Sequence, residues 1–270
     1  MVATERIHKI GHPTLEVIKY GECPQVLFIH GCTETSAIWR PVMQALGNAG
    51  VESAAVDLRG HGGSDGHGSL QEAGIEDYVA DALSTLNAMP SLRIVVGHSM
   101  GGLVTQLLAA KTDLDYAVLI ASSPVFGMRG DGLRMARKHP WTFLMSFLRR
   151  SFKRLYVDEL VTRSLLFHAR TPAATVRQFM SLVQEDSWRA GNEMNSILPD
   201  PRAVRCPITV IGGADDFMVS RASTDATASA YGVEPIYLEG CAHMVPLESD
   251  PVMLSRLIMS SPLRAQQQDA

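Results

Sequence analysis

The chain has 270 residues, of which 46% are hydrophobic, and its formal net charge at pH 7 is −4. This hydrophobic content suffices for a large buried core and excludes wholesale disorder. The mild acidity gives the surface no general attraction for nucleic acid, so we predict no nucleic-acid partner.

The sequence carries no recognisable signal for export or membrane insertion. Residues 1–10 hold charged side chains and no apolar run, which is not typical of a secretory signal. No apolar stretch is long enough to span a bilayer, so we expect no stable membrane insertion and a cytoplasmic location. The four cysteines form no CxxC pair, which argues against a zinc site or a disulfide framework. The oligomeric state stays open.

Short apolar runs rich in β-branched residues recur along the chain and predict strands. Runs of this kind are typical of parallel strands that helices cover on both faces. They lie at residues 26–30, 53–57, 93–97, 116–121, 208–212 and 235–238. Residues 14–20, which follow a Gly-His-Pro turn, predict an antiparallel edge strand paired with the segment before it.

Longer segments of helical pattern alternate with these strands, at residues 36–48, 76–88, 100–110, 221–231 and 251–259. The alternation predicts an α/β fold with a mostly parallel sheet between two layers of helices. Between residues 124 and 204 no strand is evident, and the pattern is helical and amphipathic. We therefore predict a core of residues 1–123 plus 205–260, a helical cap inserted at 124–204, and a frayed tail at 261–270.

The motif Gly97-His98-Ser99-Met100-Gly101 follows a predicted strand and opens a predicted helix. This context is typical of a nucleophile elbow, a sharp turn that presents a serine hydroxyl. The two outer glycines omit side chains that would collide in so tight a turn. An ordinary glycine-rich turn is the alternative, and the context favours a catalytic role for Ser99.

A serine hydroxyl is a poor nucleophile until a base removes its proton. His243, just beyond the last predicted strand, is the best placed of the nine histidines. The base in turn needs a carboxylate that fixes its tautomer. Asp216, just past the strand at 208–212, is the preferred carboxylate, and the adjacent Asp215 stays open as the alternative.

The oxygen of a tetrahedral intermediate carries negative charge and requires hydrogen-bond donors aimed at it. The backbone N–H of Met100, directly after the serine, is one predicted donor. The second is predicted in the His30-Gly31-Cys32 segment, at the N–H of Cys32. A simple turn at the end of the strand is the alternative for this segment.

Taken together, five segments resemble the α/β-hydrolase superfamily, in its serine-nucleophile form with a helical cap. They are HG at 30–31, DLRGHGGSD at 57–65, GHSMGG at 97–102, GADD at 213–216 and GCAH at 240–243. The resemblance spans residues 26–259 and implies an eight-stranded, mostly parallel sheet flanked by helices, with an inserted helical cap. It implies a structural turn at 57–65, without chemistry. Ser220, where proline is common, and Cys32 depart from the family's usual pattern, and neither departure removes a catalytic group.

The resemblance implies a serine hydrolase that cleaves an apolar ester-like substrate, a carboxylester, thioester or lactone, through an acyl-enzyme intermediate. A carbon–carbon bond hydrolase or a lyase of the same fold is one alternative, and a ligand-binding, receptor-like relative is another. Relatives that open epoxides use an Asp nucleophile, so Ser99 argues against that reaction. No cofactor is predicted, because no nucleotide-binding motif is present, and no metal, because no ligand spacing supports one.

Several side chains near the predicted site are candidates for contact with a small apolar acyl substrate. Methionines suit an adaptable apolar pocket, although a role in the core is the alternative for each of them. The candidates are His30, Gly31, Met128, Trp188, Met218 and Met244.

The first part of the predicted cap is basic, with aromatic and aliphatic residues between its Lys and Arg. We predict a solvated helix face whose apolar stripe packs on the core. A site for a phosphate-bearing group or a membrane surface is the alternative. The apolar residues are Trp141, Phe143, Leu144, Phe147, Leu148, Phe152 and Leu155.

Overall fold

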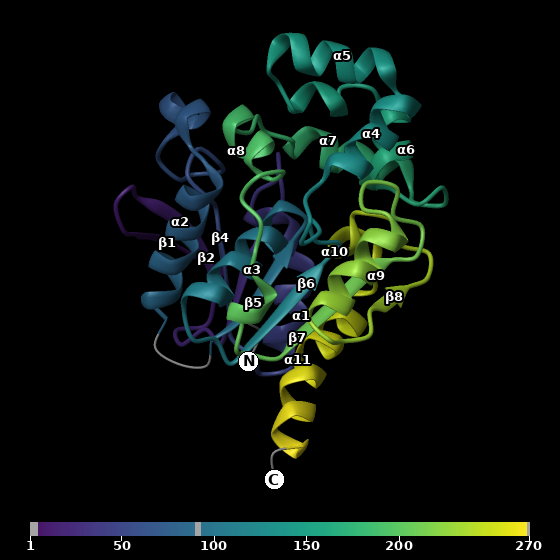
Figure 1. Cartoon of the computed structure of the whole chain (residues 1–270). Helices are drawn as coiled ribbons and strands as arrows, with labels where there is room; N and C mark the ends of the chain where they lie inside the picture. The colour runs from purple at the N-terminus through teal and green to yellow at the C-terminus, as the bar shows by residue number, and fades with distance from the viewer. Residues whose placement is uncertain (1–4, 90–92, 269–270) are drawn as a thin grey trace.

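The computed structural model describes residues 5–89 and 93–268. Its centre is an eight-stranded sheet with the strand order β1-β2-β4-β3-β5-β6-β7-β8. The strands are β1 (Glu5–Ile10), β2 (Leu15–Tyr20), β3 (Val26–Ile29), β4 (Ser53–Val56), β5 (Ile94–His98), β6 (Tyr116–Ile120), β7 (Ile208–Gly213) and β8 (Ile236–Leu238). Helices lie on both sides of this sheet (Figure 1). The predicted α/β fold class is confirmed.

The pairing of the strands brings their carboxyl ends to one edge. Strand β2 runs antiparallel to β1, as the sequence predicts, and also antiparallel to β4 on its other side. All strands from β4 to β8 in the sheet order are parallel. From β3 the chain moves outward to β4 and then returns to β5 on the other side of β3. Ligands of open α/β sheets bind beside such a reversal, at the carboxyl ends of the strands.

Helices of the sheet domain match the predicted ones closely. They are α1 (Arg40–Asn48), α2 (Ile75–Asn87), α3 (Met100–Lys111), α9 (Arg221–Ala230), α10 (Val245–Glu248) and α11 (Pro251–Gln268), with short 3-10 turns at η1 (Ser36–Trp39) and η2 (His67–Glu72). The last helix is longer than predicted, since it continues to Gln268 within the segment expected to be frayed. Residues 269–270 of that segment lie outside the described residues. Ala and Gln, which favour helices, make up residues 265–268.

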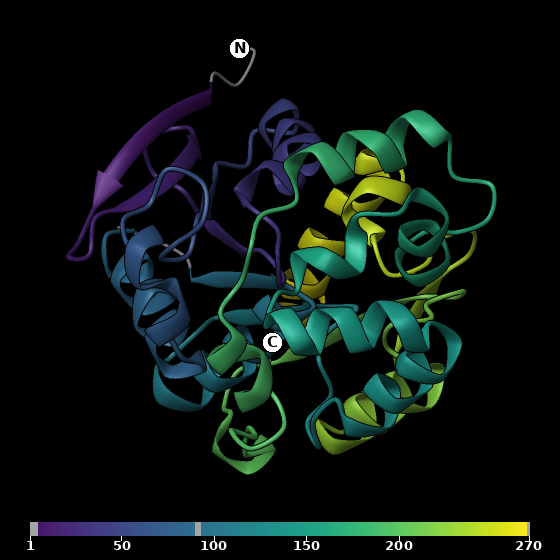
Figure 2. The same ribbon diagram turned by 90° about the horizontal axis from the view of Figure 1, so that it is seen from above.

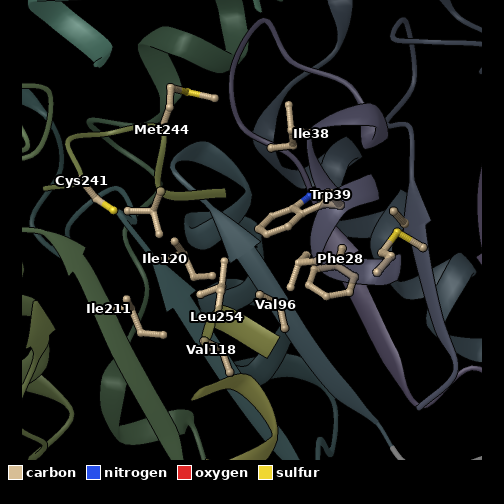
Figure 3. Close-up of a cluster of buried hydrophobic side chains, with 14 of the residues drawn as sticks. Phe28, Ile38, Trp39, Val96, Val118, Ile120, Ile211, Cys241, Met244 and Leu254 are labelled. Atoms are coloured by element: carbon tan, nitrogen blue, oxygen red, sulfur yellow. The ribbon is translucent and has the colours of Figure 1, made fainter. Parts of the chain in front are cut away.

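The core lies on both faces of the sheet, because successive strand residues point to opposite sides. On one face, Phe28, Val96 and Ile120 pack with Trp39 and with Leu254 of α11 (Figure 3). On the other face, the intervening strand residues pack against α2 and α3. This double burial explains why the strands are continuously apolar rather than alternating.

A helical insertion separates β6 from β7, at the place where the sequence predicts one. All residues between these two strands are described, and none of them lies in a strand. The insertion contains α4 (Arg129–Lys138), α5 (Pro140–Arg149), η3 (Lys153–Tyr156), α6 (Glu159–Leu166), α7 (Ala173–Leu182), α8 (Trp188–Glu193) and η4 (Pro201–Ala203). Its helices α4 to α8 lie above the carboxyl edge of the sheet (Figures 1 and 2).

The packing predicted for the basic part of the insertion is wrong for one helix. Leu155 is buried, and Phe143 and Phe152 pack against the core. The remaining apolar residues of the predicted stripe all belong to α5 and face solvent instead. They are Trp141, Leu144, Phe147 and Leu148.

Candidate active site

Ser99 occupies the turn between β5 and α3 in a strained backbone conformation. Its φ of 52° and ψ of −116° are rare for a residue with a side chain. A Cβ at Gly97 would lie 2.2 Å from the carbonyl oxygen of Gly101, and a Cβ at Gly101 would lie 2.4 Å from that of His30. The turn therefore requires both glycines of the motif, as the sequence predicts.

Replacement of Gly101 by alanine is expected to lower the free energy of unfolding by about 3 kcal/mol or more, because the new methyl group meets backbone that cannot move aside cheaply. Urea unfolding followed by tryptophan fluorescence measures the change. Gly130→Ala is the matched control, since nothing lies within 4 Å of a Cβ there and alanine favours helix α4. Equal stability of the two variants would show that the turn is not tightly packed.

Three side chains from distant parts of the sequence meet above the turn. The Nε2 of His243 lies 3.0 Å from the Oγ of Ser99, and its Nδ1 lies 2.9 Å from the Oδ2 of Asp216. Because a carboxylate only accepts, Nδ1 carries the hydrogen, and Nε2 is left to accept from the serine hydroxyl. The other oxygen of Asp216 accepts from the backbone N–H of Val219 at 2.9 Å, which fixes the carboxylate.

The structure separates the two adjacent aspartates that the sequence left open. The side chain of Asp216 is 4% exposed and bonded to His243. The side chain of Asp215 is 55% exposed and lies 3.7 Å from the ring of His168 instead. Of the two carboxylates, only that of Asp216 reaches His243.

The predicted oxyanion segment passes directly beside the serine. A Cβ at Gly31 would lie 3.0 Å from the Cβ of Ser99, so a side chain at position 31 would crowd the serine. Neither the backbone N–H of Cys32 nor that of Met100 has an acceptor in the described part of the chain. Burial and the neighbouring Asp186 carboxylate raise the pKa of the Cys32 thiol, which argues against a thiolate nucleophile here.

A buried ion pair that the sequence did not reveal contacts the segments that carry Gly31 and His243. Glu34 accepts from the N–H of Gly31 at 2.6 Å and contacts Nδ1 of His98 at 3.0 Å. The Nε2 of His98 donates to the carbonyl oxygen of His243 at 2.9 Å. The pair thus joins the segment after β3, the end of β5 and the loop that carries His243.

The charges of this pair follow from its contacts. Burial alone lowers the pKa of His98, but the Glu34 carboxylate outweighs burial, and the pKa lies above its ordinary value. Burial alone raises the pKa of Glu34, and His98 outweighs it in the opposite direction. Both nitrogens of His98 face oxygens that only accept, so the ring is an imidazolium held by a carboxylate.

A second buried carboxylate, Asp186 of the insertion, bonds to the segment after β3. It accepts from the N–H of Thr33 and the hydroxyl of Tyr78, each at 2.8 Å. Its Oδ2 lies 3.3 Å from Nε2 of His61. Burial opposes ionisation, but His61 and these hydrogen bonds outweigh it and lower the pKa of Asp186 to about 2. No local motif marks Asp186 or Glu34, since their partners lie elsewhere in the sequence or are backbone groups.

The six predicted substrate contacts fall into different environments. His30 is fully buried, and both of its ring nitrogens are bonded to the protein, at Gly31 and Leu58. That leaves its ring no free polar group, so the geometry favours a structural role. Met244 is fully buried in the core. Gly31 lies beside Ser99, whereas Met128, Met218 and Trp188 are half-buried.

The histidines and carboxylates around the serine pair with one another or with the backbone. Within residues 5–89 and 93–268, no group of three or more His, Cys, Asp or Glu residues is arranged to hold a metal ion.

The sheet order, the strained serine turn and the sequential order of serine, aspartate and histidine together define an α/β-hydrolase. The family pattern described as Hydrolase_4, serine aminopeptidase S33, matches residues 22–250. The chain belongs to this family.

Individual relatives either have low sequence identity to this chain or align with it over only part of their length. A 2-(acetamidomethylene)succinate hydrolase from Mesorhizobium japonicum is 39% identical over 103 residues, which cover 38% of this chain and 36% of that protein. A monoacylglycerol lipase from Mycolicibacterium smegmatis is 25% identical over 233 residues, 79% of this chain and 78% of the lipase. The crystal structure of an E-2-(acetamidomethylene)succinate hydrolase matches with a TM-score of 0.70 at 22% identity, covering 96% of this chain and 99% of that one. At that identity the structural match shows the fold.

Proposed function

We propose that this protein is a serine hydrolase that cleaves an apolar ester-like substrate, a carboxylester, thioester or lactone, through an acyl-enzyme intermediate. The observation that carries the proposal is the continuous chain of contacts from Ser99 through His243 to Asp216. The similarity to a monoacylglycerol lipase, which extends over 79% of this chain, supports the ester class of substrate. A serine at the nucleophile position argues against epoxide opening.

In the first step, the Oγ of Ser99 attacks the carbonyl carbon while Nε2 of His243 takes its proton. The carboxylate of Asp216 holds the imidazole in the required tautomer and stabilises the imidazolium that forms. Negative charge develops on the former carbonyl oxygen. The N–H groups of Cys32 and Met100, which have no acceptor among the described residues, are the proposed donors to that oxygen.

In the second step, the imidazolium protonates the leaving group, which departs and leaves Ser99 acylated. Neutral His243 then activates a water molecule, which attacks the acyl carbon and releases the acid. The helical insertion above the sheet edge serves as a cap over this chemistry. Its half-buried Met128 and Trp188, together with Met218 after β7, are the proposed apolar contacts for the acyl group.

Hydrolysis of p-nitrophenyl esters from acetate to laurate tests this function. We expect turnover by the natural sequence, with an optimum chain length that reports the size of the pocket. A fluorophosphonate probe should form one covalent adduct per protein molecule, located on Ser99 by mass spectrometry. Ser99→Ala should abolish both signals, whereas the control Ser69→Ala, at an exposed serine, should retain them.

Two results would contradict the proposal. Labelling of another residue, or retained turnover in Ser99→Ala, would rule out Ser99 as the nucleophile. Absence of both turnover and labelling in a folded protein would rule out ester hydrolysis. In that case carbon–carbon cleavage, a lyase step or ligand binding without turnover would replace it.

A further inference from the structure

Helix α5 presents an apolar face to solvent. The exposed fractions are 69% for Trp141, 45% for Leu144, 66% for Phe147 and 62% for Leu148. We call these four residues the α5 face. Their spacings of three and four residues place them on one side of the helix. A surface helix normally turns such a stripe toward the core. Here the ring of Phe147 meets Trp188 edge-on at 5.9 Å, and most of the α5 face remains exposed to solvent.

The α5 face lies at the outer limit of the molecule. Helix α5 lies on the side of the insertion away from the sheet (Figure 1). In the described part of the chain, thirteen large hydrophobic side chains are exposed, and ten of them belong to residues 124–204. Single exposed apolar residues are ordinary on a protein surface. A concentration of them in one part of a protein, here the insertion, is typical of an interaction surface.

The stretch of sequence that contains this helix is strongly basic. Residues 132–157 contain seven Lys and Arg and no Asp or Glu, in a chain with a formal net charge of −4. Five of these basic side chains are exposed and form no ion pair within the described residues: Arg137, Arg149, Arg150, Lys153 and Arg154. An apolar helix face in a segment with these exposed basic side chains is complementary to a partner that has an apolar interior and an anionic surface.

We propose that the α5 face docks the protein on an anionic lipid surface. Trp141 and its apolar neighbours enter the headgroup region, and the unpaired basic side chains contact lipid phosphates. Contact between two copies through this face would oppose like charges, which disfavours self-association as the occupant. The attachment is peripheral: no helix in the part of the chain that the structure describes is long and apolar enough to cross a membrane.

Sedimentation with sucrose-loaded vesicles tests the proposal. The Ser99→Ala form is used so that hydrolysis of lipid cannot alter the vesicles. We expect binding to 7:3 phosphatidylcholine–phosphatidylglycerol vesicles at least about tenfold tighter than to pure phosphatidylcholine, and weaker in 0.5 M NaCl. This readout needs no turnover. Docking and the proposed hydrolase activity can therefore fail independently.

Paired variants separate the apolar contribution from the charged one. Trp141→Ser/Leu148→Ser should weaken binding to the anionic vesicles at least about tenfold, and so should Arg149→Glu/Arg154→Glu. The matched controls lie on α11, with Val252→Ser/Met253→Ser for exposed apolar residues and Arg256→Glu for an exposed charge. These controls should bind as the parent does. Unchanged thermal melting curves establish that all variants fold.

Three outcomes would overturn the proposal. The parent protein could fail to sediment with anionic vesicles. The α11 controls could lose as much binding as the α5 variants. The parent could instead form a dimer in analytical ultracentrifugation that Trp141→Ser/Leu148→Ser dissociates, which would identify a second copy of the chain as the occupant.

Discussion

Replacing either Ser99 or His243 by alanine is expected to lower kcat for a p-nitrophenyl ester by about 10⁵- to 10⁶-fold, and replacing both should cause no larger loss. The reason is that the two side chains, 3.0 Å apart, act as one unit. Without the base the hydroxyl keeps its proton, and without the hydroxyl the base has nothing to activate. Steady-state kinetics of the two single variants and the double variant form the measurement.

The carboxylate should contribute less than the other two groups. Asp216→Ala is expected to lower kcat by about 10⁴-fold, because the imidazole can still accept a proton but loses its fixed tautomer and the charge that stabilises the imidazolium. Asp215→Ala is the matched control and should leave kcat within about twofold, since that side chain is 55% exposed and lies against His168 rather than His243. For the Ser99 and His243 variants of the first prediction, the contradicting result is a double variant whose loss in kcat equals the product of the two single losses. That result would show that the two side chains act independently.

Asp186→Asn is expected to lower the free energy of unfolding by about 3–5 kcal/mol, the usual effect of removing one partner of a buried ion pair. The amide leaves His61 without a counter-charge. Its NH₂ group is itself a donor and would face Thr33 N–H or Tyr78 O–H, which donate to the carboxylate in the natural protein. Denaturant unfolding near pH 5.5 measures the loss. Asp113→Ala is the control, since that carboxylate is 89% exposed and should change the stability by less than about 0.5 kcal/mol.

The size of this effect should depend on pH in a defined direction. The pKa of Asp186 is lowered to about 2 from an ordinary 3.8, so its stabilising contribution is complete above about pH 4 and is lost as the pH falls through 2. Burial alone lowers the pKa of His61, but the Asp186 carboxylate outweighs burial, and the pKa is raised above its ordinary value. That contribution is complete below about pH 6.5 and is lost as the pH rises past the raised pKa. The difference between the natural protein and Asp186→Asn should therefore be largest near pH 5–6, and a difference that grows toward pH 2 would contradict the pairing.

The elements that the sequence predicted well are those whose signal is local. Buried parallel strands appear in the sequence as continuous apolar runs. The glycines around Ser99 indicate a turn so tight that a larger residue at their positions would collide with the backbone. The order of Ser99, Asp216 and His243 along the chain then follows the superfamily resemblance. What the sequence left open was the choice between two adjacent aspartates, because one residue of difference after β7 decides which carboxylate faces the histidine.

The features that the sequence missed depend on tertiary packing. Asp186 and Thr33 are 153 residues apart, and no spacing rule connects them. Nothing in the sequence around Glu34 distinguishes it from other loop residues, because its partner His98 approaches it only in the folded protein. The apolar stripe of α5 was recognised, but a helical pattern does not specify whether its apolar side faces a core or solvent. The prediction that the stripe packs on the core is therefore wrong for Trp141, Leu144, Phe147 and Leu148.

The contacts made by residues 184–187 constrain how the insertion can be exchanged between related enzymes. Gln184 accepts from the N–H of Gly62, and its own N–H donates to the carbonyl of Thr33. Together with Asp186, these bonds fasten the segment between α7 and α8 to the sheet domain. A chimera that receives a foreign insertion without an acid at this position inherits an unneutralised His61 in its interior. A functional chimera would therefore have to keep residues 184–187 of the recipient. Otherwise His61 would have to be replaced by an uncharged side chain at the same time.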